Sequence, residues 1–423
     1  MREHYIKKLK IWVWIYFFLL IFEGALRKWV LPGLSQPLLI VRDPVALVLI
    51  FQTIRLGVWR PNNMVIFMWL LTTLAFIFAL IFGHNNVLVA LYGFRITAFH
   101  FPLVFITGVL FNKQDVLLMG KATLWITIIM TILVGLQFYS PQSAWVNRGV
   151  GGDTVGSGFS AAGDYFRVPG TFSFTNGLSL FYGFAAAYVF YFIINRKEIA
   201  IPPYLLWGST VALIAAIPLT VSRTVLFEVI VSAAAMVIVS GTSARQLMRL
   251  FGGAIALTLL VFILSTFSFF NTATAVFTQR VENAGQAEGD LDNVFIDRFL
   301  GGMYSALASD KNTFFGYGLG MGTNAGAKLM TGSTGFLISE GEWGRLVGEM
   351  GFLMGVSLIL IRFSLVVGMV RESWRSSRYK NTLPWMLLSF AFLNILQGQW
   401  AQPTALGFSI LTGGLILAAF KTK

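Results

Sequence analysis

The sequence contains no cysteine, only three histidines and few charged residues, which make up 12% of its 423 positions. The lack of cysteine excludes disulfide bonds, thiolate metal sites and thiol nucleophiles. The low charge content, combined with 56% hydrophobic residues and a mean hydropathy of +0.74, excludes an ordinary soluble globular protein. No His, Asp or Glu residues have the spacing of metal ligands, so the sequence predicts neither a bound metal nor a cofactor.

Apolar runs long enough to cross a membrane fill most of the chain. One helical crossing needs about 20 residues, and the runs are too long for the ten-residue alternating strands of an outer-membrane barrel. We therefore predict an all-α polytopic membrane protein, with a single membrane domain over residues 1–423 and about 12 transmembrane helices. The predicted spans are 11–31, 37–58, 64–82, 87–111, 119–139, 176–194, 201–220, 224–240, 250–270, 346–370, 384–401 and 404–420.

The basic residues predict the orientation of these spans. The chain carries 31 Lys and Arg against 18 Asp and Glu, a formal net charge of +13. If the N-terminus is cytoplasmic, every segment that faces inward is basic, as the positive-inside rule requires, and both termini are cytoplasmic. Nucleic-acid binding is then not needed to explain the charge. The basic residues of the inward segments are Arg2, Lys7, Lys8, Lys10, Arg55, Arg60, Lys113, Lys121, Arg196, Lys197, Arg245, Arg249, Arg371, Arg375, Arg378, Lys380, Lys421 and Lys423.

Two outward segments are too long to be simple turns. Residues 140–175 form a loop rich in glycine and serine, which we expect to be irregular. Residues 271–342 form a larger, net acidic loop, in which 291–309 has apolar residues near helical spacing. That stretch predicts an amphipathic helix on the outer membrane face.

Charged residues within or beside the spans are candidates for function, because each is costly in hydrocarbon. Glu342, Arg345 and Glu349 share one helix face, which is equally compatible with an ion-pair ladder and with an active site at the outer surface. For Arg42 and Asp43 we favour a structural ion pair. Three further charges near the outer end of the first span are expected at the membrane interface, namely Glu23, Arg27 and Lys28.

Four stretches of the outer segments carry a resemblance to a known family. They are Arg167-Val-Pro-Gly170-Thr-Phe-Ser-Phe-Thr-Asn176, Thr220-Val-Ser222-Arg223, Phe315-Gly-Tyr-Gly-Leu-Gly320 and the segment 340–355. Their order, and their common placement on the outer side, resemble the O-antigen ligase and Wzy-type polysaccharide polymerase family of bacterial inner-membrane glycosyltransferases. The resemblance covers residues 165–355, whereas the flanking spans are similar only in hydropathy. One position departs from the ligase branch, where a His-Asn pair precedes the Glu of Glu-x-Gly by nine residues. Glu340 and Gly341 stand in that place here.

The resemblance implies a GT-C-like helical fold and metal-independent transfer of a glycan from an undecaprenyl-diphosphate carrier to an acceptor hydroxyl at the periplasmic face. Arg223 and Arg167 would stabilise the diphosphate leaving group, because guanidinium donates paired hydrogen bonds to phosphate oxygens. Glu340 would deprotonate the acceptor. The residues that would contact substrate are Asn176, Arg298, Glu342, Arg345 and Glu349.

The resemblance also implies partners in the same pathway, namely a lipid-linked oligosaccharide, membrane lipid, a chain-length regulator and a flippase. The residues themselves leave two other functions open. Twelve spans with both ends inside also describe a transporter or flippase for a lipid-linked sugar or an anionic solute, although a carrier would concentrate its polar residues near the bilayer midplane. A non-catalytic assembly protein of an envelope pathway is the third hypothesis. Aromatic residues that are candidates for stacking on sugar rings are Trp343, Tyr317, Phe172 and Phe174.

Overall fold

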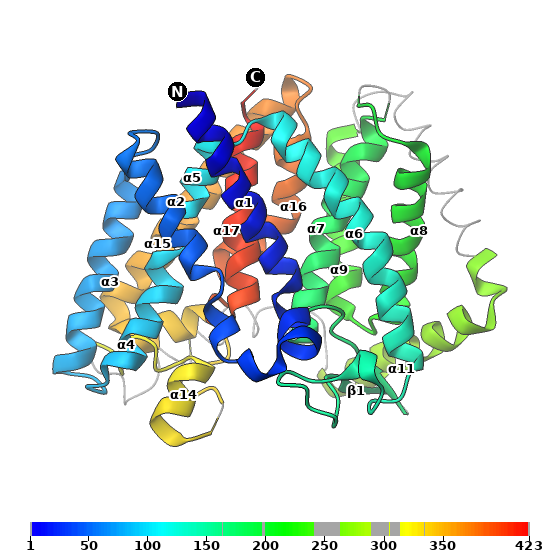
Figure 1. The fold of residues 1–423 in the computed structure, drawn as a ribbon, viewed down its shortest axis with the longest axis horizontal. Coiled ribbons are helices and arrows are strands. Elements are labelled where there is room, and N and C mark those ends of the chain that lie inside the picture. The colour runs from blue at the N-terminus through cyan, green and yellow to red at the C-terminus, as the bar shows by residue number, and fades with distance from the viewer. Residues whose placement is uncertain are drawn as a thin grey trace.

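The computed structural model describes residues 2–162, 164–196, 199–240, 263–288, 304, 314–333 and 335–421, and these residues are mostly helical (Figure 1). The α-helices are α1 (Arg2–Ala25), α2 (Asp43–Arg55), α3 (Asn63–Ile81), α4 (Val87–Phe94), α5 (Pro102–Leu110), α6 (Lys113–Tyr139), α7 (Thr175–Ile194), α8 (Pro203–Leu219), α9 (Arg223–Ser240), α11 (Ser268–Glu288), α14 (Asn324–Thr331), α15 (Glu342–Arg378), α16 (Leu383–Gln397) and α17 (Pro403–Ala419). Short helices are η1 (Leu26–Val30), η2 (Pro32–Leu34), η3 (Pro37–Ile40), η4 (Arg95–Phe99) and η5 (Trp145–Asn147), and the strands are β1 (Phe159–Ala162) and β2 (Tyr165–Arg167).

The helices confirm a helical membrane protein. Within the described ranges, 8 helical segments are long and apolar enough to cross a membrane, and three shorter apolar helices, α8, α16 and α17, accompany them. All the predicted spans except 250–270 coincide with these helices; most of 250–270 lies outside the described residues. The prediction of about 12 spans therefore stays a prediction.

Polar residues at the helix ends explain where several helices begin. Asn62 caps α3, and Asn86 caps α4, by accepting hydrogen bonds from backbone N–H groups. Asn112 and Asp115 form a capping box at the start of α6. Pro102 occupies the first position of α5, which interrupts the fourth predicted span after the π-helical turn η4. The polar breaks in the apolar pattern thus mark real helix termini.

Both chain termini lie at one end of the bundle, and β1, α11 and α14 lie at the opposite end (Figure 1). At the end with the termini, Lys10 of α1 forms an ion pair of 2.5 Å with Asp115 at the start of α6. We call the opposite end, which carries β1, α11 and α14, the distal end. The side of the membrane on which the termini lie stays a prediction from the charges.

The two long loops contain more regular structure than expected. In the 140–175 loop, β1 and β2 pair antiparallel, with Phe159 opposite Arg167. Asn147 is buried and donates hydrogen bonds to three backbone carbonyls, so this loop is held in a defined shape. The larger loop begins with helix α11. The predicted amphipathic helix 291–309 lies outside the described residues, apart from Tyr304.

Helix α15 folds back on itself at Gly351, whose φ of 76° and ψ of 170° are not helical. A straight helix would place Glu342 and Arg362 about 30 Å apart, yet Arg362 Nη2 donates to Glu342 Oε1 at 2.8 Å. The segment 342–350 therefore lies alongside the span that follows it, rather than extending the predicted span 346–370. Its N-terminus at Glu342 reaches the level of Arg362, about 15 Å along the span from Gly351.

The Gly351 bend gives a prediction on stability. A Cβ on Gly351 would collide with the carbonyl oxygen of Phe314, and φ near 76° with extended ψ is accessible only to glycine. We expect Gly351→Ala to lower the unfolding temperature by several degrees or more, measured by thermal denaturation in detergent. Gly368→Ala is the matched control, because a Cβ there meets nothing within 4 Å and alanine favours a helix by about 1 kcal/mol. Equal unfolding temperatures for the two variants would contradict this account.

The three charges predicted at the membrane interface are buried within the protein: Glu23 and Arg27 are 6% exposed and Lys28 is 0% exposed. Glu23 pairs with Arg27 at 3.2 Å and with Arg42 at 3.7 Å. Ion pairing and hydrogen bonds inside the protein offset the desolvation that would otherwise drive these charges outward. The sequence does not show this burial, because it does not show which helices cover the first span.

The predicted pair between Arg42 and Asp43 was wrong, since each residue binds a different element. Arg42 donates to the Pro403 carbonyl at 2.6 Å, at the start of α17. Asp43 accepts two hydrogen bonds from Arg95, at 2.5 and 2.9 Å, and contacts His100 Nε2 at 3.0 Å. These contacts join helices that are distant in sequence.

Candidate functional site

Three arginines gather at the distal end. Arg167 ends β2, Arg223 begins α9 and Arg280 lies in α11, and all three are partly exposed. Burial, then the charges of Arg280 and Arg223, lower the pKa of Arg167 from its usual value. In the described chain Arg167 forms no ion pair, and its buried Nε has no hydrogen-bond partner. Because the charges of these arginines act on one another, an anion with several oxygens would stabilise the cluster.

The turn before Arg223 is strained. Val221 has a φ of 46°, in the left-handed region that β-branched residues rarely adopt. The next residue, Ser222, exchanges a hydrogen bond of 2.9 Å with Ser179 of α7 and accepts one from Val225 N–H at 3.4 Å. The turn is thereby fixed to α7, and it starts α9 at Arg223. Strain of this kind is common where a side chain must be aimed at a functional site.

A buried clamp holds the motif loop, residues 167–176. Gly170 N–H donates to Gln137 Oε1 at 2.9 Å, and the Gly170 carbonyl accepts from Lys28 Nζ at 2.6 Å and from Gln137 Nε2 at 3.3 Å. Thr171 Oγ1 donates to the Ile21 carbonyl of α1 at 2.7 Å. The buried amino group of Lys28 thus binds the loop that begins with Arg167.

The clamp gives a second prediction. Lys28→Met removes a donor to a buried carbonyl, and an unsatisfied buried group costs about 1–3 kcal/mol, so amide hydrogen exchange over 165–175 should accelerate by about tenfold or more. Lys8→Met, at an exposed position near the N-terminus, is the control and should leave exchange there unchanged. Unchanged exchange in a folded Lys28→Met protein would mean that Gln137 holds the loop alone.

A row of side-chain amides links the motif loop to the linker 398–402 between α16 and α17. Asn176 Nδ2 donates to Gln402 Oε1 at 2.8 Å, Gln402 Nε2 donates to Gln399 Oε1, and Gln399 Nε2 donates to the Glu340 carbonyl at 2.6 Å. The row therefore brings three separate parts of the sequence together at the distal end.

The linker 398–402 lies below the distal surface. Helix α16 has 15 residues and spans about 22 Å, whereas the hydrocarbon core is about 30 Å thick. Trp400 is 1% exposed, and its ring lies 3.5 Å from the Arg362 guanidinium. Arg362 itself lies about 15 Å along the span from Gly351. Polar backbone at this depth is tolerated where it lines a cavity or is buried in protein.

The predicted ladder of Glu342, Arg345 and Glu349 is confirmed, and Arg362 joins it. Arg345 donates to Glu342 at 2.8 and 3.0 Å and to Glu349 Oε2 at 2.7 Å. The four side chains are 1–2% exposed, and their two positive and two negative charges cancel. Because each carboxylate is held by arginine inside the protein, we assign this network a structural role.

The glycine-rich loop packs against this network. Gly316, Gly318 and Gly320 all have positive φ, and Gly322 N–H donates to Glu349 Oε1 at 2.9 Å. A Cβ on Gly320 would collide with the Val89 carbonyl of α4. The glycines therefore let the loop fit between α4 and α15, which is a structural reason for the motif.

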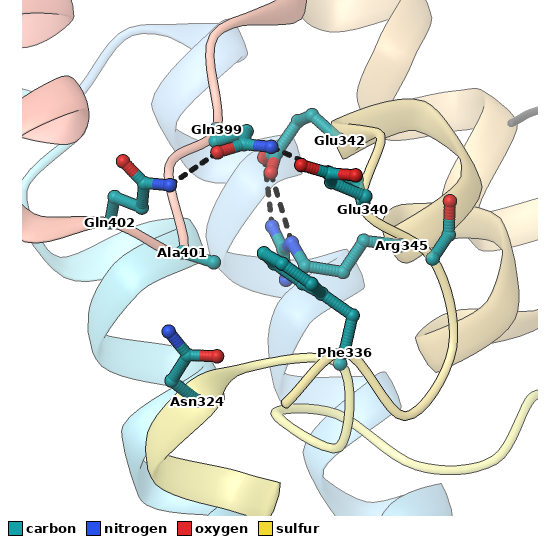
Figure 2. A pocket seen from close by; sticks show the side chains of 10 residues that line it. Asn324, Phe336, Glu340, Glu342, Arg345, Gln399, Ala401 and Gln402 are labelled. Carbon is teal, nitrogen blue, oxygen red and sulfur yellow. Dashed lines mark hydrogen bonds and ion pairs between the residues drawn. The ribbon is translucent and has the colours of Figure 1, made fainter. Parts of the chain in front are cut away.

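A small pocket, open to solvent, lies between the amide row and the ladder (Figure 2). Glu340 is exposed, whereas Glu342 and Arg345 form its buried side. Figure 2 shows Gln399 and Gln402 along one side and Phe336 and Asn324 on the other. The described residues that line it are Gly322, Asn324, Phe336, Ser339, Glu340, Glu342, Arg345, Gln399, Ala401 and Gln402.

The residues predicted from the motifs fall into three groups. Arg167 and Arg223 lie in the arginine cluster. Asn176, Glu340, Glu342 and Arg345 line the pocket or join its amide row, whereas Glu349 is enclosed by the ladder and the glycine loop. Arg298 lies outside the described residues.

Two of the predicted aromatic candidates separate clearly. Phe172 is 2% exposed and packs against Phe181 and Phe408, so it belongs to the core and the prediction of a sugar contact was wrong. Phe174 is 58% exposed and stays a candidate.

Sequence reasoning missed Gln399 and Gln402, although two glutamines in a short polar break between apolar runs were a usable signal.

The chain matches no family model, no curated protein and no solved structure in comparisons with each. Among the residues that the structure describes, no group of three or more His, Asp or Glu side chains is arranged to hold a metal ion. The function is therefore argued from the geometry of the distal end.

Proposed function

We propose that the protein is a membrane glycosyltransferase that moves a glycan from a polyprenyl diphosphate to an acceptor hydroxyl, as a polysaccharide polymerase or ligase does. The observation that carries the proposal is the pairing of two features at one end of the bundle. Arg167, Arg223 and Arg280 provide an anion site, and the amide row connects the loop of Arg167 to a pocket with an exposed carboxylate, Glu340.

The arginine cluster and Glu340 each have one role in the reaction. The acceptor oxygen attacks the anomeric carbon, its bond to the diphosphate oxygen breaks, and the diphosphate leaves with the bonding electron pair. The arginines stabilise the negative charge that develops on that leaving group. Glu340 accepts the acceptor proton. The products are a longer glycan, polyprenyl diphosphate and a proton.

The depth of the pocket supports a lipid-linked substrate. Trp400 of the linker 398–402 and Glu342 both contact Arg362, about 15 Å along the span from the bend at Gly351. A polyprenyl chain stays in the hydrocarbon, so its diphosphate and first sugar sit at the membrane interface. A site sunk to that level meets them without pulling the lipid out of the bilayer.

A carrier for lipid-linked sugars is the alternative, and one observation favours it. Charged side chains, including the buried Glu23 and Arg42 and the partly exposed Asp43, lie within the bundle, where carriers place their binding sites. Their charged partners, however, are supplied by the protein itself. A carrier would move labelled lipid-linked sugar across liposomes without lengthening it.

The proposal is tested with the full-length protein in detergent and a polyprenyl-diphosphate-linked oligosaccharide. We expect a ladder of longer glycans on a gel, together with free polyprenyl diphosphate. Supplying separate acceptors distinguishes a ligase from a polymerase. A protein that is folded, binds the lipid-linked oligosaccharide and leaves it unextended with every acceptor would contradict the proposal.

A further inference from the structure

The amide row retains unused hydrogen-bonding capacity next to the pocket. A side-chain amide has two N–H donors and an oxygen that accepts two hydrogen bonds. Within the described contacts, Gln399 and Gln402 each donate one bond and accept one. Each amide therefore keeps one donor and one acceptor, which suits the adjacent hydroxyl groups of a sugar ring.

The opposite side of the pocket offers an apolar surface. Phe336 lines the pocket and is 48% exposed, and Figure 2 shows its ring between the amide row and Asn324. An exposed aromatic ring packs well against the C–H face of a hexose, and an amide at its edge binds a hydroxyl. The pocket is open to solvent and encloses little space, so a single sugar ring would lie across its mouth, against Phe336 and the amide row.

The charge of the pocket disfavours an anion. Glu342 and Arg345 belong to the neutral ladder, so Glu340 is the one uncompensated charge among the described lining residues. An anionic group would meet the Glu340 carboxylate here and three arginines at the cluster. The two regions therefore favour different parts of a substrate.

We infer that this pocket binds an uncharged hexose ring of the acceptor glycan, held by Gln399 and Gln402 and packed against Phe336, and that it discriminates against acidic sugars. The inference rests on the proposed function, since it assigns the acceptor subsite of that reaction. The diphosphate of the donor then occupies the arginine cluster, and Glu340 lies beside the acceptor hydroxyl that it deprotonates.

The test is binding of two soluble trisaccharides to the full-length protein in nanodiscs, followed by saturation-transfer NMR. One is an uncharged hexose trisaccharide, and the other ends in a uronic acid. We expect the uncharged ligand to bind at least about fivefold more tightly, the ratio that about 1 kcal/mol of charge repulsion produces. Gln399→Ala and Gln402→Ala should each weaken its binding by about fivefold. Gln114→Ala, at an exposed position on α6, should not.

The variant Glu340→Gln tests the discrimination between the two ligands, which a purely structural role of Glu340 would not affect. It should remove the discrimination and bind both trisaccharides equally. Equal binding by the wild type, no binding of either ligand, or unchanged binding by both glutamine variants would each overturn the inference. If the wild type extends lipid-linked glycans but does not select the uncharged ligand, only the inference fails. If it selects that ligand but transfers nothing, the proposed function fails and the sugar site stands.

Discussion

Arg223→Ala is expected to reduce glycan transfer by at least about a hundredfold while the protein stays folded. Removing one group that stabilises charge in a transition state typically costs this much, and Arg223 is partly exposed at the start of α9, so the change leaves no large cavity. The measurement is the initial rate of glycan extension from a polyprenyl-diphosphate-linked oligosaccharide. The unfolding temperature of the Arg223→Ala protein is measured in the same preparation.

Two further variants identify the cause of that loss. Arg223→Lys keeps the charge but loses the planar paired donors, so we expect an intermediate rate. Arg55→Ala, an exposed arginine at the end of α2, should leave transfer unchanged. An Arg223→Ala rate within about threefold of wild type would remove Arg223 from the proposed mechanism.

Hydropathy and charge predicted the helical membrane fold because each membrane crossing is encoded locally. A span requires about 20 apolar residues whatever it packs against, and the polar breaks between runs coincide with helix ends. Local spacing also predicted the ladder, because residues three and four apart on a helix are neighbours. These features depend on short stretches of sequence.

The features that sequence reasoning missed depend on contacts between distant segments. Arg362 joins the ladder because the chain bends at Gly351. The apolar pattern of the sequence continues through that bend, so it does not reveal it. Lys28 is buried where its amino group donates a hydrogen bond to the Gly170 carbonyl, which belongs to a loop distant in sequence. Gln399 and Gln402 matter through Asn176, more than two hundred residues earlier. Spacing along one helix contains no information about such partners.

Glu340 and Glu342 stand two residues apart, yet substitution of each should have opposite consequences. Glu342→Gln leaves Arg345 and Arg362 buried with a single remaining carboxylate, Glu349, and breaking such a network costs about 3–5 kcal/mol. We therefore expect a fall in unfolding temperature of many degrees, measured by thermal denaturation in detergent. Glu340 is exposed, so Glu340→Gln should leave that temperature unchanged.

Transfer should respond in the reverse way. Glu340→Gln keeps the size of the side chain but cannot accept a proton, so we expect the rate of glycan extension to fall by about a hundredfold. In Glu342→Gln, any protein that remains folded should still have Glu340 and the arginine cluster, and its loss of rate should follow its loss of folded protein. If Glu340→Gln destabilises the protein as Glu342→Gln does, its carboxylate is structural. If it transfers glycan normally, the proton goes to a different group, and the chemistry must then be sought at the arginine cluster and its surroundings.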